Sequence, residues 1–215
     1  MDKMVLFDFD GVIALNTEEI TMSVIANLVN RSVNEVSDLV MGMGGKMLIE
    51  TLNKTYNLNI SEKEIMYRRM EIMKQDSILK KDPSLIPFLD MLKFNNVKYT
   101  IVTSSSRPPV EIALKKLNLN KYFDLIYSMD DFDFIKSKCD LYKIIGDKYK
   151  NNKILIIEDS LRGITNAYES NIGSVIAYAG CDGLLKNNSK YFNFVRDKVI
   201  KIAYNFDDIC YFIGF

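Results

Sequence analysis

Residues 4–11 read MVLFDFDG. The apolar run at residues 4–9 predicts a buried β-strand, because short apolar runs that end at turn signals are typical of strands in a protein core. Asp8 and Asp10 lie at the end of this run, and a charged carboxylate is costly to bury without a partner. We therefore expect the two carboxylates to lie at the rim of a sheet, where they can take part in a reaction.

The rest of the chain alternates between strand-like and helical patterns. Further strands are expected at residues 98–103, 124–127, 153–157 and 174–179, with a weaker one near 198–203. Amphipathic helices are expected at residues 84–94, 110–117, 140–149, 161–170 and 207–213. This alternation predicts an α/β fold, a Rossmann-like doubly wound parallel sheet with helices on both faces.

One long gap interrupts the alternation, at residues 17–81, where only helical patterns occur. Within it, Ser61 and Glu64 form a capping-box pattern that predicts the start of a long helix. The sequence therefore predicts a helical subdomain inserted after the first strand. We expect residues 1–16 and 82–215 to form the α/β core domain and residues 17–81 to form a helical cap domain.

Composition and charge narrow the class of protein. The chain has 215 residues, of which 48% are hydrophobic and 26% charged, and its 28 basic residues balance 28 acidic ones. This composition is globular and provides no basic surface for nucleic acid or an anionic membrane. Three widely spaced cysteines without a CxxC pair are typical of free thiols in a reducing compartment.

No apolar run has the length of a membrane span, and the first residues do not form a signal peptide. We therefore expect a cytoplasmic protein with no membrane partner and a small molecule as its ligand. No pattern in the sequence predicts the oligomeric state.

Polar side chains follow the ends of the predicted strands, which is where ligands bind in a doubly wound sheet. They are Asp8, Asp10, the run TSSS at residues 103–106, Lys136, Glu158, Asp159 and Ser160. Carboxylates this close repel one another unless a cation lies among them, and an all-oxygen ligand set favours Mg²⁺. Such a site suits phosphoryl transfer, with Asp8 as the nucleophile and Asp10 as the acid that protonates the leaving alcohol.

Four segments resemble the motifs of the haloacid dehalogenase-like (HAD) superfamily. FDFDGV is similar to the DxDxG[TV] signature, IVTSSS to the hydroxyl motif, IKSKCDLY to a GKPxPD motif and IIEDSLRGITNA to the acidic motif. The four segments occur in the order of the family, and the resemblance extends over nearly the whole chain, including the cap insertion between the first and second motifs. The resemblance implies the subfamily with a helical cap, which contains phosphatases and β-phosphoglucomutases.

The resemblance also implies a role for each matching residue. Asp8 is expected to be the nucleophile and a Mg²⁺ ligand, and Asp10 the acid and base, with its carbonyl on the metal. Asp159 is expected to be the second metal carboxylate, with Glu158 in support. The residues implied to bind phosphate are Ser104, Ser105 and Lys136.

The lysine motif and the cap leave alternatives open. Both prolines of GKPxPD are missing, so Lys138 is an alternative to Lys136 as the phosphate-binding lysine. In the predicted cap, Lys46 and Arg69 are candidate substrate contacts. Lys46 follows a glycine-rich stretch that resembles the flexible cap loop of relatives but fits a plain turn equally well. Arg68 and Arg69 are more typical of a solvated helix face.

The sequence predicts a Mg²⁺-dependent phosphatase that hydrolyses a small phosphorylated metabolite, with a sugar phosphate expected, through a phospho-aspartate intermediate. The alternative is a β-phosphoglucomutase, which uses the same motifs. Those mutases carry a histidine near the start of the cap, and this chain has no histidine, which favours the phosphatase. A hydrolytic dehalogenase lacks the acid at the position of Asp10, and a phospho-accepting receiver domain lacks the cap.

Overall fold

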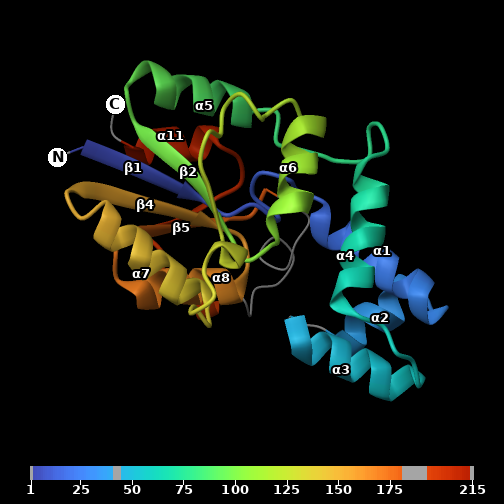
Figure 1. Ribbon diagram of the computed structural model, residues 1–215. Helices are drawn as coiled ribbons and strands as arrows, with labels where there is room; N and C mark the ends of the chain where they lie inside the picture. Colours follow the sequence, from blue (N-terminus) through green and yellow to red (C-terminus); the bar gives the residue numbers. More distant parts are fainter. Residues whose placement is uncertain (1, 41–44, 181–192, 214–215) are drawn as a thin grey trace.

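The computed structural model describes residues 2–40, 45–180 and 193–213. The chain begins with a strand, continues through a run of helices, and then alternates between strands and helices (Figure 1). The strands are β1 (Asp2–Phe7), β2 (Lys98–Thr103), β3 (Ile126–Ser128), β4 (Asn152–Glu158), β5 (Ser174–Tyr178) and β6 (Lys201–Ala203). The helices are α1 (Thr17–Val29), α2 (Val33–Val40), α3 (Gly45–Tyr56), α4 (Glu62–Met73), α5 (Leu85–Phe94), α6 (Arg107–Lys116), α7 (Lys138–Lys148), α8 (Leu161–Ser170) and α11 (Asp207–Ile213), with a short 3₁₀ helix η1 (Met129–Asp131).

The six strands form one parallel sheet in the order β3-β2-β1-β4-β5-β6. The strand order reverses beside β1, because the chain runs outward through β2 and β3 and then returns to β4 on the other side of β1. In such sheets the crevice at the carboxyl ends of the strands beside this reversal is the usual ligand site. The predicted α/β, Rossmann-like fold is confirmed.

The core consists of two apolar layers, one on each face of the sheet. Side chains alternate along β1, so Val5 and Phe7 join the layer under α5, α6 and α11, while Met4 and Leu6 join the layer under α7 and α8 (Figure 1). Phe7 is fully buried and lies 6.0 Å from Phe88 between ring centroids. Burial on both faces explains why the part of this strand from Met4 to Phe7 is entirely apolar.

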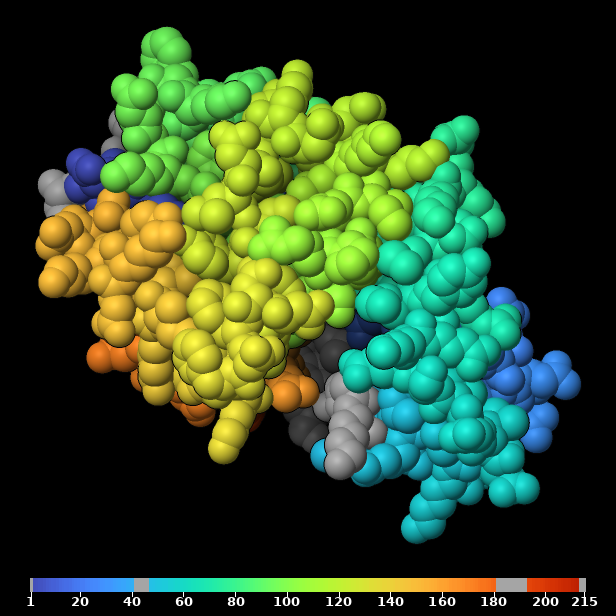
Figure 2. Space-filling model, viewed as in Figure 1, coloured from blue at the N-terminus to red at the C-terminus, as the bar shows by residue number. Residues whose placement is uncertain are grey.

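Helices α1–α4 lie together beside the sheet rather than on it (Figure 1). They have an apolar cluster of their own, in which Val24, Val36 and Leu52 are buried. Figure 2 shows the cap helices α3 and α4, in cyan and teal, beside the yellow and green part of the core, and α4 is in contact with α6 of the core. These contacts support the expected division at residues 17 and 81, which stays a prediction.

The two chain segments that join the core to the cap are tied together by Asn16. Its Nδ2 donates to the carbonyl of Ile78 at 2.8 Å, and its Oδ1 accepts from the backbone N–H of Lys80 at 2.9 Å. The backbone N–H of Leu15 also donates to the Lys80 carbonyl at 2.9 Å. This pairing fixes how the inserted helices leave and re-enter the core. No helix within the described ranges has the length and apolar character needed to cross a bilayer.

We expect Phe7→Ala to lower the free energy of unfolding by about 3–5 kcal/mol, because it opens a cavity in the centre of the sheet. Phe94→Ala is the matched control, because Phe94 is 87% exposed and its removal leaves the core intact. Urea unfolding followed by circular dichroism measures both. Equal loss of stability in the two variants would contradict this description of the core.

Candidate active site

The carboxyl ends of β1 and β4 bring three carboxylates together. Asp8 directly follows β1, Glu158 ends β4 and Asp159 is the next residue. Each offers one carboxylate oxygen within 4.8 Å of the others. The backbone N–H of Asp8 donates to the carbonyl of Ile157 at 2.9 Å, which extends the pairing of the two strands up to the site. These three residues could hold a metal ion.

A tight turn after β1 makes room for this cluster. Gly11 has a φ of 76°, which is in the left-handed region that favours glycine. A Cβ at this position would lie 1.9 Å from Oδ2 of Asp159. The turn closes through a hydrogen bond of 2.9 Å from the Gly11 N–H to the Ala14 carbonyl. Glycine is therefore required both for the backbone angle and for the approach of Asp159.

Lys138 lies between two of the carboxylates. Its Nζ is 2.5 Å from Oδ1 of Asp8 and 2.6 Å from Oε1 of Glu158, and its side chain is only 6% exposed. Tyr142, which follows on the same face of α7, donates its hydroxyl to the same Glu158 oxygen at 2.7 Å. The first turn of α7 thus holds the ends of β1 and β4 in a fixed relation.

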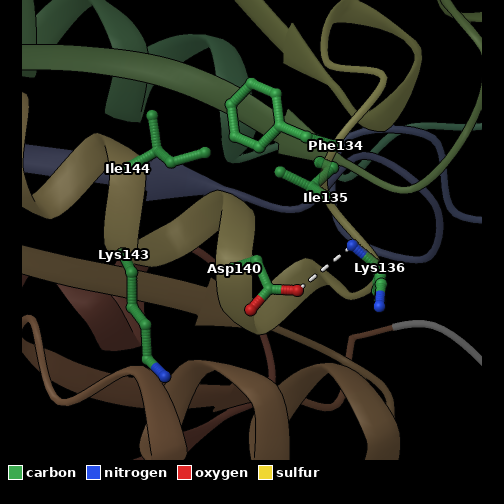
Figure 3. A pocket seen from close by; sticks show the side chains of 6 residues that line it. All are labelled: Phe134, Ile135, Lys136, Asp140, Lys143 and Ile144. Carbon is green, nitrogen blue, oxygen red and sulfur yellow. Dashed lines mark hydrogen bonds between the residues drawn. The ribbon is translucent and has the colours of Figure 1, made fainter.

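Lys136, which the sequence predicts at the site, lies elsewhere. Its side chain is exposed, and its backbone N–H donates to Asp140 at 3.2 Å (Figure 3). Ser137 caps α7 in a capping box with Asp140, so the helix begins at Lys138. Lys138 therefore points from the first turn of α7 into the site. Lys136 precedes the N-cap residue Ser137 and lines a surface pocket with Phe134 (Figure 3). The expected position of Lys136 at the site is therefore corrected: the lysine beside Asp8 is Lys138, and its phosphate-binding role stays a prediction.

Burial and mutual repulsion perturb the charges of the cluster. Burial raises the pKa values of Asp8 and Asp159 well above the usual value, and the charge of Glu158 raises both further. Burial alone would lower the pKa of Lys138, but the attraction of Asp8 and Glu158 outweighs it, so the net shift is upward. One ammonium thus faces three carboxylates. A divalent cation among them would balance the remaining negative charge.

Asp10 is held by three side chains from different segments. Oδ1 accepts from Nη2 of Arg69 in the cap helix α4, and Oδ2 accepts from the hydroxyl of Ser105 after β2. Burial raises the pKa of Asp10, but Arg69, Ser105 and Thr17 together bring it below the usual value. The Asp10 side chain is still 30% exposed, so it is within reach of a bound ligand.

The structure therefore brings most of the expected residues to one edge of the sheet. Ser104 lies exposed at the end of β2, next to Ser105. The side chain of Lys46 lies outside the described residues, so its expected substrate contact remains a prediction. Tyr142 was not predicted as a site residue, although its spacing of one helical turn from Lys138 is a usable signal. Thr17 was also not predicted as a site residue, because a threonine at this position is expected in the first turn of a helix whether or not it contacts Asp10.

We expect Lys138→Met to lower the free energy of unfolding by about 3–5 kcal/mol, because it leaves two buried carboxylates without their cation. Lys136→Met should change it by less than about 0.5 kcal/mol, as for most exposed positions. Urea unfolding in metal-free buffer measures both.

The loss of unfolding free energy in Lys138→Met should depend on pH. Burial and repulsion place the folded-state pKa values of Asp8 and Asp159 above their unfolded values, so stability is lost as the pH rises and regained as these two carboxylates bind protons. The deficit should be smaller near about pH 5 than near about pH 8. A deficit that does not change with pH, or one as large in Lys136→Met, would contradict the geometry described above.

Comparison with curated proteins finds relatives of moderate similarity. The chain is 28% identical over 134 residues to the pyrophosphatase PpaX of Bacillus mycoides (strain KBAB4). The match covers 61% of this chain and 62% of that relative, so the chain spans about 62% of the length of the curated protein that it matches.

Comparison with solved structures shows the same fold over the whole chain. A conserved haloacid dehalogenase-like protein of Agrobacterium tumefaciens has a TM-score of 0.76 and 21% identity, covering 100% of this chain and 98% of that one. A HAD hydrolase of family IA, variant 3, from Entamoeba histolytica has a TM-score of 0.73 and 23% identity, covering 97% and 95%. At these identities the likeness shows the fold alone. The family model described as haloacid dehalogenase-like hydrolase matches residues 5–177, and the chain therefore belongs to this family.

Proposed function

We propose that this protein is a metal-dependent phosphatase that releases phosphate from a small phosphomonoester, with a sugar phosphate expected, through a phospho-aspartate at Asp8. The observation that carries the proposal is the position of Asp8 at the carboxyl end of the central strand, fixed by Lys138, with Asp10 two residues further on. The name of the curated relative, a pyrophosphatase, supports phosphoryl chemistry.

The donor set fits a hard divalent cation such as Mg²⁺. Asp8 and Asp159 would hold it through carboxylate oxygens and Asp10 through its carbonyl, with Glu158 in support. Oε2 of Glu158 is buried and has no hydrogen-bond partner among the described residues, which is the kind of oxygen that a cation would satisfy. When bound, the cation would neutralise the charge of the phosphate oxygens.

The contacts of Asp8 indicate which of its oxygens reacts. Oδ1 accepts from the Phe9 N–H at 2.7 Å and from Lys138 at 2.5 Å, which leaves Oδ2 to attack phosphorus. Formation of the bond from Oδ2 to phosphorus breaks the ester bond, and the leaving oxygen takes a proton from Asp10 in its protonated form. Because Arg69, Ser105 and Thr17 lower the pKa of Asp10 in the free site, this step requires that the bound substrate anion raises that pKa so that Asp10 carries a proton. In the second half, Asp10 takes a proton from water, which attacks phosphorus and releases phosphate from Asp8.

Lys138 and Ser104 would act on the phosphate itself. Lys138 is the buried ammonium nearest to the attacking residue, and its charge offsets the charge that develops on the phosphate oxygens. Ser104 is exposed at the same edge and offers a hydroxyl to a phosphate oxygen. Ser105 instead donates to Asp10, so its contribution is to orient the acid.

We expect Asp8→Asn to lower turnover by several powers of ten, each worth about 1.4 kcal/mol of barrier, because an amide is a poor nucleophile. Phosphate release from a panel of phosphomonoesters with Mg²⁺ measures the loss. Asp38→Asn, at an exposed position in α2, is the matched control and should keep full activity. Activity of Asp8→Asn within tenfold of wild type would contradict the assignment.

A mutase would pass the phosphate from Asp8 back to the sugar instead of to water. The chain has no histidine that could couple sugar binding to the alignment of Asp10. We therefore expect β-glucose 1-phosphate, where it is accepted, to yield glucose and inorganic phosphate, with or without a sugar bisphosphate primer. Phosphorus NMR follows both products. Faster accumulation of glucose 6-phosphate than of inorganic phosphate would replace the phosphatase with the mutase.

A further inference from the structure

Arg69 lies on the packed face of α4, where an apolar side chain would be expected. Ile65 is one turn before it and Ile72 about one turn after it, and both pack in the apolar clusters. The side chain of Arg69 is only 14% exposed. A charged side chain is rarely placed on such a face unless it has a partner. The expectation, drawn from the sequence, that Arg69 lies on a solvated helix face is therefore wrong.

The guanidinium of Arg69 has an N–H donor that no described residue accepts. Nη2 donates to Asp10, whereas Nε is buried and has no hydrogen-bond partner among the described residues. A guanidinium has five N–H donors in a planar fork that matches the two oxygens of a carboxylate or phosphate. Because a buried donor without a partner is costly, a ligand that supplies an acceptor here is bound favourably.

We propose that Arg69 binds a second anionic group of the substrate, a carboxylate or a phosphate, carried by the leaving alcohol close to the ester. This inference rests on the proposed phosphatase function, in which Asp10 protonates the leaving oxygen. Arg69 contacts Asp10 directly, so a group that reaches Arg69 belongs to the leaving alcohol and lies only a few bonds from the ester oxygen. The substrate class narrows to phosphorylated acids and closely spaced diphosphates.

The charge of the site agrees with this class. Among the described residues, the carboxylates of Asp8, Asp10, Glu158 and Asp159 face the ammonium of Lys138 and the guanidinium of Arg69. Lys138 is committed to two of those carboxylates. A leaving group with its own negative charge needs a separate cation, and within the described part of the cap Arg69 supplies one at Asp10.

The test compares substrates that differ only in the second anion. 2-Phosphoglycerate is paired with glycerol 2-phosphate, which has a hydroxymethyl group in place of the carboxylate, and ethylene glycol bisphosphate is paired with ethylene glycol monophosphate, which has a free hydroxyl in place of the second phosphate. We expect wild type to prefer the anionic member of at least one pair in kcat/KM by roughly 10- to 100-fold, the factor that a charged hydrogen bond contributes. The first pair tests a carboxylate and the second a phosphate.

Two neighbouring arginines provide matched variants. Arg69→Gln should reduce the preference to within about threefold, while Arg69→Lys should retain part of it through its charge. Arg68→Gln is the control, because Arg68 is exposed and pairs with Glu64 at 2.9 Å on the outer face of the same helix. It should keep the full preference. Circular dichroism verifies that each variant is folded.

A binding experiment separates this inference from the proposed function. Isothermal titration with Mg²⁺ compares phosphonoacetate with ethylphosphonate, and methylenediphosphonate with methylphosphonate, in wild type and Arg69→Gln. Arg69-dependent preference for the anionic phosphonates supports the inference even where no ester is hydrolysed, an outcome that would overturn the phosphatase. Hydrolysis and binding without preference in wild type, or a preference kept by Arg69→Gln, would overturn the inference and leave the phosphatase intact.

Discussion

The ammonium of Lys138 lies between two buried carboxylates, and the arrangement of the site depends on this contact. Asp8 comes from the end of β1, Glu158 from the end of β4 and Lys138 from the first turn of α7. A buried charge is tolerated only when it is paired and hydrogen-bonded, so these three elements must keep their register for the three groups to stay in contact. The requirement couples the stability of the core to the geometry of the candidate reaction centre.

The sheet order places this contact at the centre of the molecule. β1 is flanked by β2 and β4, and all three strands are parallel, so their carboxyl ends and the residues that follow them share one edge. Parallel strands that are buried on both faces have apolar sequences, which leaves their ends as the place where polar groups can gather. The same edge is where the cap is inserted. The candidate reaction centre therefore lies at the edge of the sheet where the cap joins the core.

The cap adds what the sheet lacks. The core residues of the site are mostly acidic, whereas the cap brings the guanidinium of Arg69 over Asp10. Asn16 ties together the two segments through which the chain enters and leaves the cap. The reach of Arg69 to the core thus depends on a connection that is itself hydrogen-bonded. Under the proposed function, this division would place the reaction in the core and the selection of the leaving group in the cap.

Local sequence patterns were enough to predict the α/β class, the inserted helices and the group of carboxylates Asp8, Asp10, Glu158 and Asp159. Strand ends are readable because apolar runs stop where charged residues begin, and parallel strands place those ends together. The spacing within FDFDG and IIEDS then leaves little freedom in where the carboxylates lie.

The lysine, serine and arginine that join these carboxylates could be identified only from the three-dimensional packing of the chain. Successive residues near the start of a helix point in directions about 100° apart, so the starting residue of α7 settles Lys138 over Lys136. The contact of Ser105 with Asp10 depends on the path of the loop after β2, and that of Arg69 depends on where the cap lies against the core. These contacts join residues that are far apart in the chain, so they cannot be predicted from the local sequence pattern.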